Sequence, residues 1–551
     1  MRKTFKKITS LMLASCMCIG MLAGCGKEKE EETTVNKADL TPAQYYGVES
    51  WDSVEYEVAK EDHYRNYYEV FLYSYADSNG DGVGDIQGLI SKLDYIDELG
   101  INGIWLMPTM PSTTYHKYDV VDYYGVDAEY GTLEDFQQLL EECHNRNINL
   151  IIDFVFNHTS SKHEWFTTAV EYYRSLPAGA EPDYTVCPYA NYYNFAKSED
   201  APSGTYTKIS NSEWSYESVF WSEMPDLNLD NEVVRQEIEK AAKYWLDMGV
   251  DGFRLDAAKE YTSGNTPKNT EVLNWFENYV VSVKEDAFVV AEVWDGYNII
   301  KDFYESGIES MFDYAYGDSD GYLMQNLKGG EGFTFAKRLE STQDGYLESN
   351  ENMVNSPFLS NHDTGRIAGF AGGKDGRIKM ACALNQIMSG CSFVYYGEEI
   401  GMSGSGKDEN KRAPMNWSSF VGGVTTAGPS GMEAVVNKFE PLDSQMEDIN
   451  SIYWYYRKML HIRSTYEEIA KGKVEAIDLG NDTVCAISKE YNGEKIYILC
   501  NFKDEPVTVS LSSSDYDYSK LVESLVINSD DEVKVDGDNI TLPGYGVAFL
   551  K

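Results

Sequence analysis

The chain has 551 residues, which is long enough for more than one domain. It carries 90 acidic against 46 basic residues, a net charge of -44. This excess argues against nucleic acid or an anionic membrane surface as a partner held by charge.

The N-terminus has the pattern of a bacterial export signal. Four basic residues lie among the first seven and precede the apolar stretch 8–22, which is too short to span a bilayer comfortably. The LAGC segment at 22–25 resembles the lipoprotein box, whose cysteine becomes the lipidated first residue. We therefore predict a signal peptide over 1–24, lipid on Cys25, and a flexible acidic tether over 25–45. The alternatives are a plain signal peptide or an uncleaved anchor.

This reading predicts an exported protein, anchored to the outer face of the cytoplasmic membrane and touching that membrane only through its lipid. Six cysteines follow Cys25, and they show neither CxxC spacing nor a zinc pattern. Cys143, Cys382 and Cys485 lie in apolar stretches typical of buried thiols. We expect few or no disulfides.

The segment DSNGDGVGD at 77–85 has oxygen-bearing side chains at alternate positions, with glycines that permit a tight turn. Such a loop suits a hard cation, and we predict Ca²⁺, with Mg²⁺ as an alternative occupant. The predicted ligands are Asp77, Asn79, Asp81, the carbonyl of Val83, and Asp85. The loop lacks the closing glutamate of an EF-hand, and the competing interpretation is a turn-rich loop after the first strand.

Strand-like and helix-like segments alternate over some 400 residues. Predicted strands cover 69–75, 103–107, 148–155, 249–255, 288–293, a site near Met311, 353–359 and 393–396. Predicted helices cover 86–99, 133–145, 233–248, 271–284, 378–388 and 450–463. This α/β alternation predicts a (β/α)8 TIM barrel formed by 46–158 and 222–465.

Two segments depart from that rhythm. Residues 159–221 are loop-like and rich in Tyr and Pro, which predicts a domain inserted after the third strand. Residues 466–551 contain short alternating runs at 483–488, 495–501 and 507–511. These runs predict a C-terminal antiparallel β-sandwich domain.

Polar residues stand where the predicted barrel strands end. Asp153 and the pair Asn157-His158 follow the third strand, and Glu292 follows the fifth. Arg254 and Asp256 end the fourth strand, and His362-Asp363 end the seventh. Because the carboxyl ends of barrel strands meet on one face, the carboxylates of Asp256, Glu292 and Asp363 should converge there.

The surroundings of these carboxyls predict different protonation states. Side chains alternate along a strand, so Arg254 and Asp256 should point the same way, and the arginine should lower the pKa of Asp256. Glu292 has no adjacent arginine and has Val293 and Trp294 as neighbours, so it is the better protonated acid. One ionised and one protonated carboxyl, roughly 5–5.5 Å apart, suit retaining glycoside hydrolysis. The alternative is a structural ion pair closing a strand.

Four segments resemble, in order and spacing, the signature regions of the α-amylase family of glycoside hydrolases (family 13): DFVFNH at 153–158, GFRLD at 252–256, AEVW at 291–294 and LSNHD at 359–363. The resemblance implies that Asp256 is the nucleophile and Glu292 the general acid/base. It implies that Asp363 fixes sugar hydroxyls. Residues it places around the substrate are Tyr118, His158, Arg254, His362 and the orienting Asp153.

Finer features concern the substrate. MPDLN at 224–228 resembles the group intermediate between oligo-1,6-glucosidases and neopullulanases, and YHKY at 115–118 is similar to the YHGY of endo-acting α-amylases. Exo-acting relatives tend to carry aspartate at the position of Tyr115, so its absence favours an open cleft. Further substrate contacts are expected from Tyr115, His116, Lys259 and Trp294. Glu260 replaces the family's usual histidine, and a second calcium site would use Asn157 and Asp226.

The sequence thus predicts a monomeric, lipid-anchored α-amylase that cleaves internal α-1,4 bonds of starch, amylose and maltodextrins at the cell surface. Within the enzyme class, the alternatives are a neopullulanase-like or α-glucosidase-like enzyme, or a glucan transglycosylase. Outside it, the alternative is a non-catalytic glucan-binding lipoprotein. Such proteins usually lose one or more of the three carboxylates, and all three are present here.

Overall fold

A computed structural model describes residues 40–51, 62–419, 423–512 and 520–551. The predicted signal peptide, Cys25 and most of the tether lie outside these residues and stay predictions. Residues Thr41–Lys551 form one compact unit. Among the described helices, none has the length and apolar character needed to cross a membrane.

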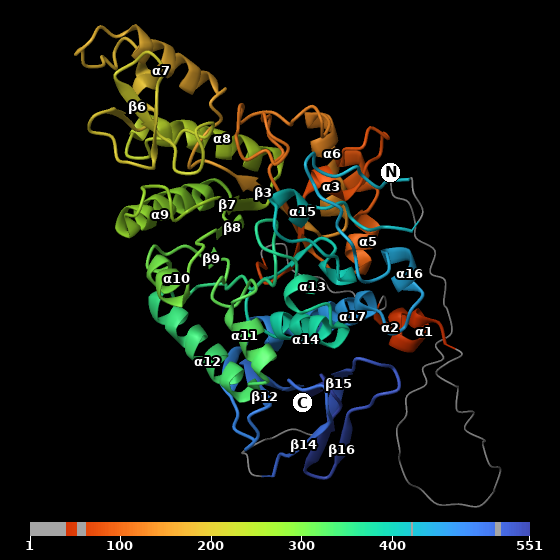
Figure 1. Ribbon diagram of the computed structural model, residues 1–551. Coiled ribbons are helices and arrows are strands. Elements are labelled where there is room, and N and C mark those ends of the chain that lie inside the picture. The colour runs from red at the N-terminus through yellow and green to blue at the C-terminus, as the bar shows by residue number, and fades with distance from the viewer. Residues whose placement is uncertain (1–39, 52–61, 420–422, 513–519) are drawn as a thin grey trace, which may run out of the picture. The chain divides into compact units, whose positions relative to one another are not determined.

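A parallel sheet forms the centre of the molecule (Figure 1), with the spatial order β10-β1-β2-β3-β7-β8-β9. The strands are β1 (Asn66–Val70), β2 (Gly103–Leu106), β3 (Asn149–Phe154), β7 (Gly252–Leu255), β8 (Phe288–Ala291), β9 (Ser310–Met311) and β10 (Ser392–Tyr395). Parallel bridges Phe312↔Ser356 and Phe358↔Phe393 join the two edges of this sheet through residues 356–358. The eighth position of the barrel is therefore filled by an extended segment.

All residues of β1, β2, β3, β7, β8 and β10 are buried. Strands covered on both faces are apolar without alternation, as in the run Phe288–Ala291. Polar residues within such strands need partners, and Arg254 on β7 finds them at the carboxyl ends of β3 and β8.

Helices follow the strands, and their ends match local signals. Thr132 and Asp135 form a capping box at the start of α6 (Leu133–Asn145), and Asn231 caps α8 (Glu232–Met248), which ends at Gly249 with φ 118°. The other long helices are α9 (Thr266–Val283), α10 (Tyr297–Tyr304), α11 (Tyr322–Gly329), α12 (Gly332–Ser349), α14 (Asp375–Gln386) and α17 (Ile452–Thr465). Shorter ones are α1 (Pro42–Tyr46), α2 (Val48–Trp51), α13 (Ile367–Phe370), η3 (Glu398–Ile400), α15 (Asp408–Lys411), α16 (Leu442–Met446) and α18 (Glu467–Lys471).

Three predicted elements were wrong. The strand predicted over 69–75 begins earlier, at Asn66, and its second half is the helical turn α3 (Leu72–Tyr75). Aromatic residues occur in both strands and helices, so their strand propensity did not decide the conformation of residues 72–75. The helix predicted over 86–99 is two helices, α4 (Ile86–Ile90) and α5 (Leu93–Glu98). The segment 353–359 forms bridges only, since Pro357 has no N–H for a ladder.

The inserted segment between β3 and α8 contains more regular structure than its loop-like sequence indicated. It holds α7 (Glu164–Ser175), the short η2 (Pro188–Asn191), and a small antiparallel sheet of β4 (Phe195–Lys197), β6 (Trp214–Glu217) and β5 (Tyr206–Lys208). Its aromatic residues pack together: the rings of Tyr173 and Phe195 lie 4.1 Å apart, and those of Phe166 and Tyr216 4.8 Å apart. Many of the tyrosines are therefore core residues.

The C-terminal part is antiparallel. One sheet has the order β11-β12-β13-β18-β15 and the other β14-β17-β16. Their bounds are β11 (Lys473–Ala476), β12 (Val484–Tyr491), β13 (Glu494–Asn501), β14 (Val507–Ser510), β15 (Leu521–Leu525), β16 (Lys534–Asp536), β17 (Asn539–Leu542) and β18 (Val547–Leu550). A separate apolar cluster, including Leu499, Ile540 and Leu542, lies between the sheets. The buried Lys379 ties the domain to the barrel by donating to the Ile527 carbonyl at 3.1 Å.

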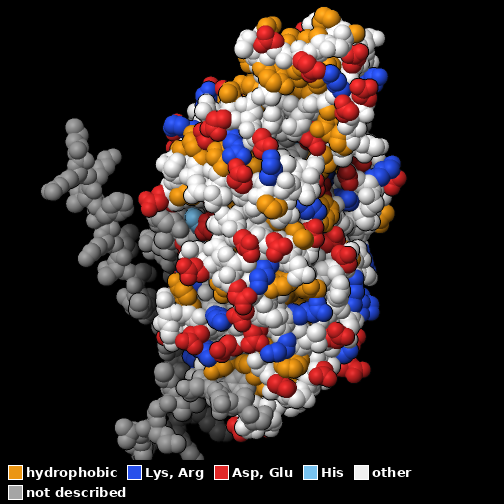
Figure 2. Space-filling view, turned by 90° about the vertical axis from the view of Figure 1, so that its left-hand side faces the viewer, with side chains coloured by type: hydrophobic (Ala, Val, Ile, Leu, Met, Phe, Trp, Pro, Cys, Tyr) orange, Lys and Arg blue, Asp and Glu red, His pale blue; other side chains and the backbone are white. Residues whose placement is uncertain are grey.

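The six cysteines that the structure describes are buried free thiols, which confirms the burial predicted for Cys143, Cys382 and Cys485. On the face shown in Figure 2, acidic and basic side chains are interspersed.

Candidate active site

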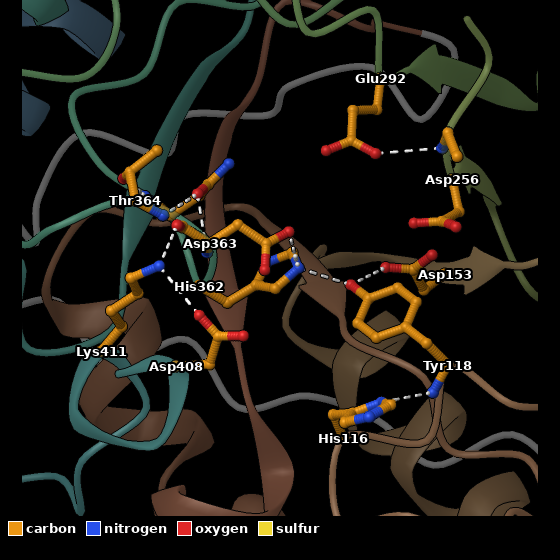
Figure 3. A network of polar contacts seen from close by, with 12 residues as sticks. His116, Tyr118, Asp153, Asp256, Glu292, His362, Asp363, Thr364, Asp408 and Lys411 are labelled. Carbon is orange, nitrogen blue, oxygen red and sulfur yellow. Dashed lines mark hydrogen bonds and ion pairs between the residues drawn. The ribbon is translucent and has the colours of Figure 1, made fainter. Parts of the chain in front are cut away.

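A cleft of about 570 Å³ opens at the carboxyl ends of the barrel strands. It is lined by His116, Tyr118, His158, Phe220, Met224, Asp256, Ala257, Lys259, Glu260, Glu292, Trp294, Asp363, Asp408 and Arg412. The three carboxyls predicted to act in catalysis thus meet in one cleft, with Glu292 and Asp256 beside each other (Figure 3). Of the predicted substrate contacts, His116, Tyr118, His158, Lys259 and Trp294 line it directly.

Arg254 lies beneath the cleft, fully buried, and joins three carboxylates. Its Nη1 is 2.9 Å from Asp153 Oδ1 and 2.7 Å from Asp256 Oδ1, and its Nη2 is 2.9 Å from Glu292 Oε2. The predicted common direction of Arg254 and Asp256 is confirmed. The expectation that Glu292 has no arginine neighbour was wrong, because strand pairing brings β7 and β8 side by side.

The predicted direction of the pKa shift was right for Glu292 and wrong for Asp256. Burial raises the pKa of Glu292, Arg254 opposes the rise, and the nearby Asp256 charge adds to it. Burial also raises the pKa of Asp256, and the guanidinium of Arg254 only partly offsets this effect. The sequence showed that Arg254 lies beside Asp256, but it did not show that the carboxyl of Asp256 is removed from water.

Asp363 lies in a different electrostatic setting. Burial alone would raise its pKa, but His362, with Nε2 at 3.0 Å from Oδ2, and Arg412, with Nη2 at 2.7 Å from Oδ1, hold the pKa of Asp363 well below its usual range. Burial disfavours a charged His362, yet Asp363 and Glu69 together raise the pKa of that ring to about 9. Glu69 Oε1 lies 2.6 Å from His362 Nδ1, so the imidazolium sits between two carboxylates.

Two donors hold Glu292 in addition to Arg254. The backbone N–H of Ala257 donates to Oε2 at 3.0 Å, and the hydroxyl of Tyr314 donates to Oε1 at 3.1 Å. Ala257 has φ 50°, in the left-handed region that side chains rarely adopt. The turn after β7 therefore carries strain at the point where its N–H meets Glu292.

The remaining predicted substrate residues lie under or beside the cleft. Asp153 and His362 are buried below it, and the Tyr118 hydroxyl bonds to both, at 3.0 Å from Asp153 Oδ2 and 2.7 Å from His362 Nε2 (Figure 3). Tyr115 does not line the cleft. Its hydroxyl accepts a hydrogen bond from Arg412 Nη1 at 3.0 Å.

In the predicted metal loop, the side-chain oxygens hydrogen-bond within the loop. Asp77 accepts from the N–H groups of Gly80 at 2.6 Å and Gly82 at 2.8 Å, while Asp85 accepts from Ser78 and caps α4 through Gly88 N at 2.7 Å. Within the described ranges, no group of three Asp, Glu, His or Cys residues is placed to hold a metal ion. The oxygen-only donor set still suits a hard cation. At the second predicted calcium site, Asn157 Nδ2 donates to Asp226 Oδ1 at 2.9 Å.

Comparison with known proteins decides the family. Residues 69–472 match the α-amylase catalytic domain, and residues 474–548 match the maltogenic amylase C-terminal domain. The chain belongs to the α-amylase family of glycoside hydrolases. The signature segments and the cleft that unites them are features of a family 13 glycoside hydrolase.

Relatives of this family 13 hydrolase carry several names. Alpha-amylase 3 of Dictyoglomus thermophilum is 39% identical over 443 residues, covering 80% of this chain and 85% of that protein. An oligo-1,6-glucosidase of Bacillus cereus is 30% identical, covering 88% and 98%. The solved structure of Eubacterium rectale Amy13B has a TM-score of 0.86 at 44% identity, covering 89% and 96%.

Several residues around the site were missed by sequence reasoning. Glu69 and Arg412 hold His362 and Asp363, and Tyr314 holds Glu292. Phe220, which lines the cleft, has an exposed fraction of 50%, so its ring is free to contact a sugar. Of these four residues, only Glu69 could have been found from the sequence. It lies in a predicted strand, and a charged residue in a buried strand requires a partner of opposite charge or a hydrogen bond.

Proposed function

We propose that this family 13 glycoside hydrolase cleaves internal α-1,4-glucosidic bonds of starch, amylose and maltodextrins with retention of configuration. The observation that carries the proposal is the arrangement of Asp256, Glu292 and Asp363 around one cleft, joined by Arg254 and His362. The two-step retaining mechanism requires one carboxyl as nucleophile and a second as general acid/base. The third carboxyl can bind the sugar hydroxyls.

In the first step, Asp256 attacks the anomeric carbon and Glu292 gives its proton to the departing glycosidic oxygen, so that bond breaks as the ester bond forms. In the second step, the ionised Glu292 removes a proton from water, which attacks the same carbon and releases Asp256. The two inversions restore the original configuration. Asp363, held ionised by His362 and Arg412, accepts hydrogen bonds from ring hydroxyls and favours the positively charged transition state.

Internal cleavage is supported by Tyr115, which stands where exo-acting relatives tend to carry an aspartate that closes the pocket on a chain end. A tyrosine here bonds to Arg412 through its hydroxyl and leaves Arg412 paired with Asp363. An end-directed, α-glucosidase-like activity is the second candidate, because relatives include enzymes named oligo-1,6-glucosidase. A time course on amylose separates the two. Internal cutting gives a rapid loss of iodine staining with mixed oligosaccharides, whereas glucose or maltose alone from the outset indicates an end-directed enzyme.

The proposal includes attachment to the cell surface through lipid on Cys25, where the enzyme would trim glucans before uptake. The support is the LAGC segment after a basic and apolar N-terminus. Metabolic labelling with a fatty acid should mark the wild-type chain and leave Cys25→Ser unlabelled. Labelling of both chains would contradict the assignment.

We also propose Ca²⁺ as the ion of the 77–85 loop, with Asp77, Asn79, Asp81, the Val83 carbonyl and Asp85 as its ligands. A bound ion would neutralise the negative charge of the loop carboxylates and raise stability. Chelation should lower the melting temperature of the wild type and have little effect on Asp81→Ala, whose side chain is exposed. Equal responses of the two proteins, or no metal by elemental analysis, would exclude the site.

A further inference from the structure

Tyr314 touches Glu292 and belongs to none of the signature segments. It follows β9, is buried, and donates its hydroxyl proton to Glu292 Oε1 at 3.1 Å. The hydroxyl oxygen of Tyr314 also accepts a hydrogen bond from Asn361 Nδ2 at 3.0 Å. One side chain thus joins the end of β8, where Glu292 stands, to the loop that carries Asp363.

The direction of this hydrogen-bond chain is fixed by the backbone. The N–H groups of Asp363 and Thr364 both point at the Asn361 side chain, at 2.9 Å each. Backbone N–H groups only donate, so the oxygen of the Asn361 amide must face them and its NH₂ must face Tyr314. The oxygen of Tyr314 then accepts from Asn361, and its single proton is left for Glu292.

The ring of Tyr314 is held in place on both sides. Trp294 stacks on it with centroids 5.1 Å apart and an interplanar angle of 18°, and Phe358 meets it edge-on at 4.8 Å. Trp294 is itself 43% exposed at the cleft. Because the ring is held on both sides, its hydroxyl is already oriented toward Glu292 before negative charge develops there. Electrostatic stabilisation is most effective when the donor needs no reorientation during the reaction.

We propose that Tyr314 is a positioning residue for Glu292, which fixes the orientation of its carboxyl and stabilises the ionised form that activates water. This inference rests on the proposed role of Glu292 as general acid/base. When Glu292 gives its proton to the leaving oxygen, the hydrogen bond from Tyr314 becomes charge-assisted and strengthens. The other charged groups facing Glu292 are Arg254, Asp256 and Asp363.

The test is the pH dependence of Tyr314→Phe. A lost donor destabilises ionised Glu292, so its pKa rises and the alkaline limb of kcat/KM moves upward by about one pH unit. The kcat on maltoheptaose should fall about tenfold because Glu292 gives up its proton less readily to the leaving oxygen. The matched control is Tyr316→Phe, whose hydroxyl bonds to Thr342 Oγ1 at 3.1 Å on α12, away from the cleft, and whose pH profile should match the wild type.

A second variant tests the direction of the chain. Asn361→Asp keeps the side-chain oxygen that accepts from the backbone N–H groups, but it replaces the NH₂ group that faces Tyr314 by a second acceptor oxygen. The hydroxyl of Tyr314 should then donate to residue 361, and Glu292 should lose this hydrogen bond. The alkaline limb should then rise, and it should rise less when the same change is made in the Tyr314→Phe background.

An active wild type with an unshifted limb in Tyr314→Phe would overturn the inference and leave the proposed function standing. Equal shifts by Asn361→Asp in both backgrounds would also overturn it, since they would mean a simple charge effect. A wild type inactive on all α-glucans would instead remove the proposed function. If Tyr314→Phe fails to fold, the Asn361→Asp profile decides, because an unshifted limb there contradicts the chain.

Discussion

Replacing Glu69 by glutamine should cost the protein more stability at neutral pH than at high pH. Glu69 lies on β1 with an exposed fraction of 1%, and its Oε1 is 2.6 Å from His362 Nδ1. Glutamine keeps an oxygen that accepts from the ring but removes the negative charge. The change thus isolates the ion pair from the hydrogen bond.

The size of the effect follows from the pKa of His362. A rise from 6.5 to about 9 corresponds to about 3 kcal/mol of stabilisation of the charged ring. Asp363 and Glu69 provide it together against the opposing effect of burial, and an equal division gives about 1.5 kcal/mol for Glu69. Burial also raises the pKa of Glu69 itself against the attraction of His362, so glutamine removes a desolvation cost across this pH range. The contribution of the ion pair is therefore the difference between the effects of Glu69→Gln at acidic and at alkaline pH. Because the folded-state pKa is raised, this stability is complete below pH 6.5 and is lost as the pH rises through about 9.

The assay is urea unfolding followed by tryptophan fluorescence at pH 6 and at about pH 9.5. The unfolding free energy of Glu69→Gln, relative to the wild type, should be about 1.5 kcal/mol lower at pH 6 than at the higher pH. The control is Glu468→Gln, which removes the buried partner of Lys551, a cation that stays charged across this range. A loss in Glu69→Gln that is equal at the two pH values, or larger at the alkaline one, would refute the reasoning.

Three further changes have defined outcomes. Asp256→Asn should reduce kcat on maltoheptaose at least about 10³-fold in a protein that still folds, and residual activity near the wild type would exclude it as nucleophile. Arg463→Met leaves the buried carbonyls of Met388 and Gly390 without their donor and should cost at least about 3 kcal/mol in urea unfolding; a small loss would contradict this. Gly252→Ala puts a Cβ 1.8 Å from the Phe288 carbonyl oxygen and should abolish soluble, folded protein, whereas Gly249→Ala, with 3.9 Å to the nearest atom, should fold.

Much of the barrel was predictable because its signals are local. The helix over 133–145 was predicted at its observed bounds, where Thr132 and Asp135 cap it, and the strand beginning at Gly103 follows from an apolar run that ends at Pro108. The convergence of the three carboxyls followed from a rule of parallel barrels, that strand ends share one face.

The protonation of the site was less predictable because it depends on burial and on distant partners. Glu69 and His362 are separated by 293 residues, and the sequence around either gives no sign of the other. Arg254 was expected beside Asp256 and Glu292 was expected to lack an adjacent arginine, yet the pairing of β7 with β8 places Glu292 against the same guanidinium. Desolvation then raises the pKa of both acids, which strand alternation does not reveal.

The central claim is that Asp256 forms a covalent bond with the sugar while Glu292 handles the proton. The most direct measurement is peptide mapping by mass spectrometry after Glu292→Gln is mixed with an α-maltosyl fluoride, whose leaving group needs no acid. We expect a maltosyl adduct on the peptide that contains Asp256, and this adduct should persist because no base activates water. An adduct on another carboxylate, or turnover to the β-anomer without any adduct, would contradict it.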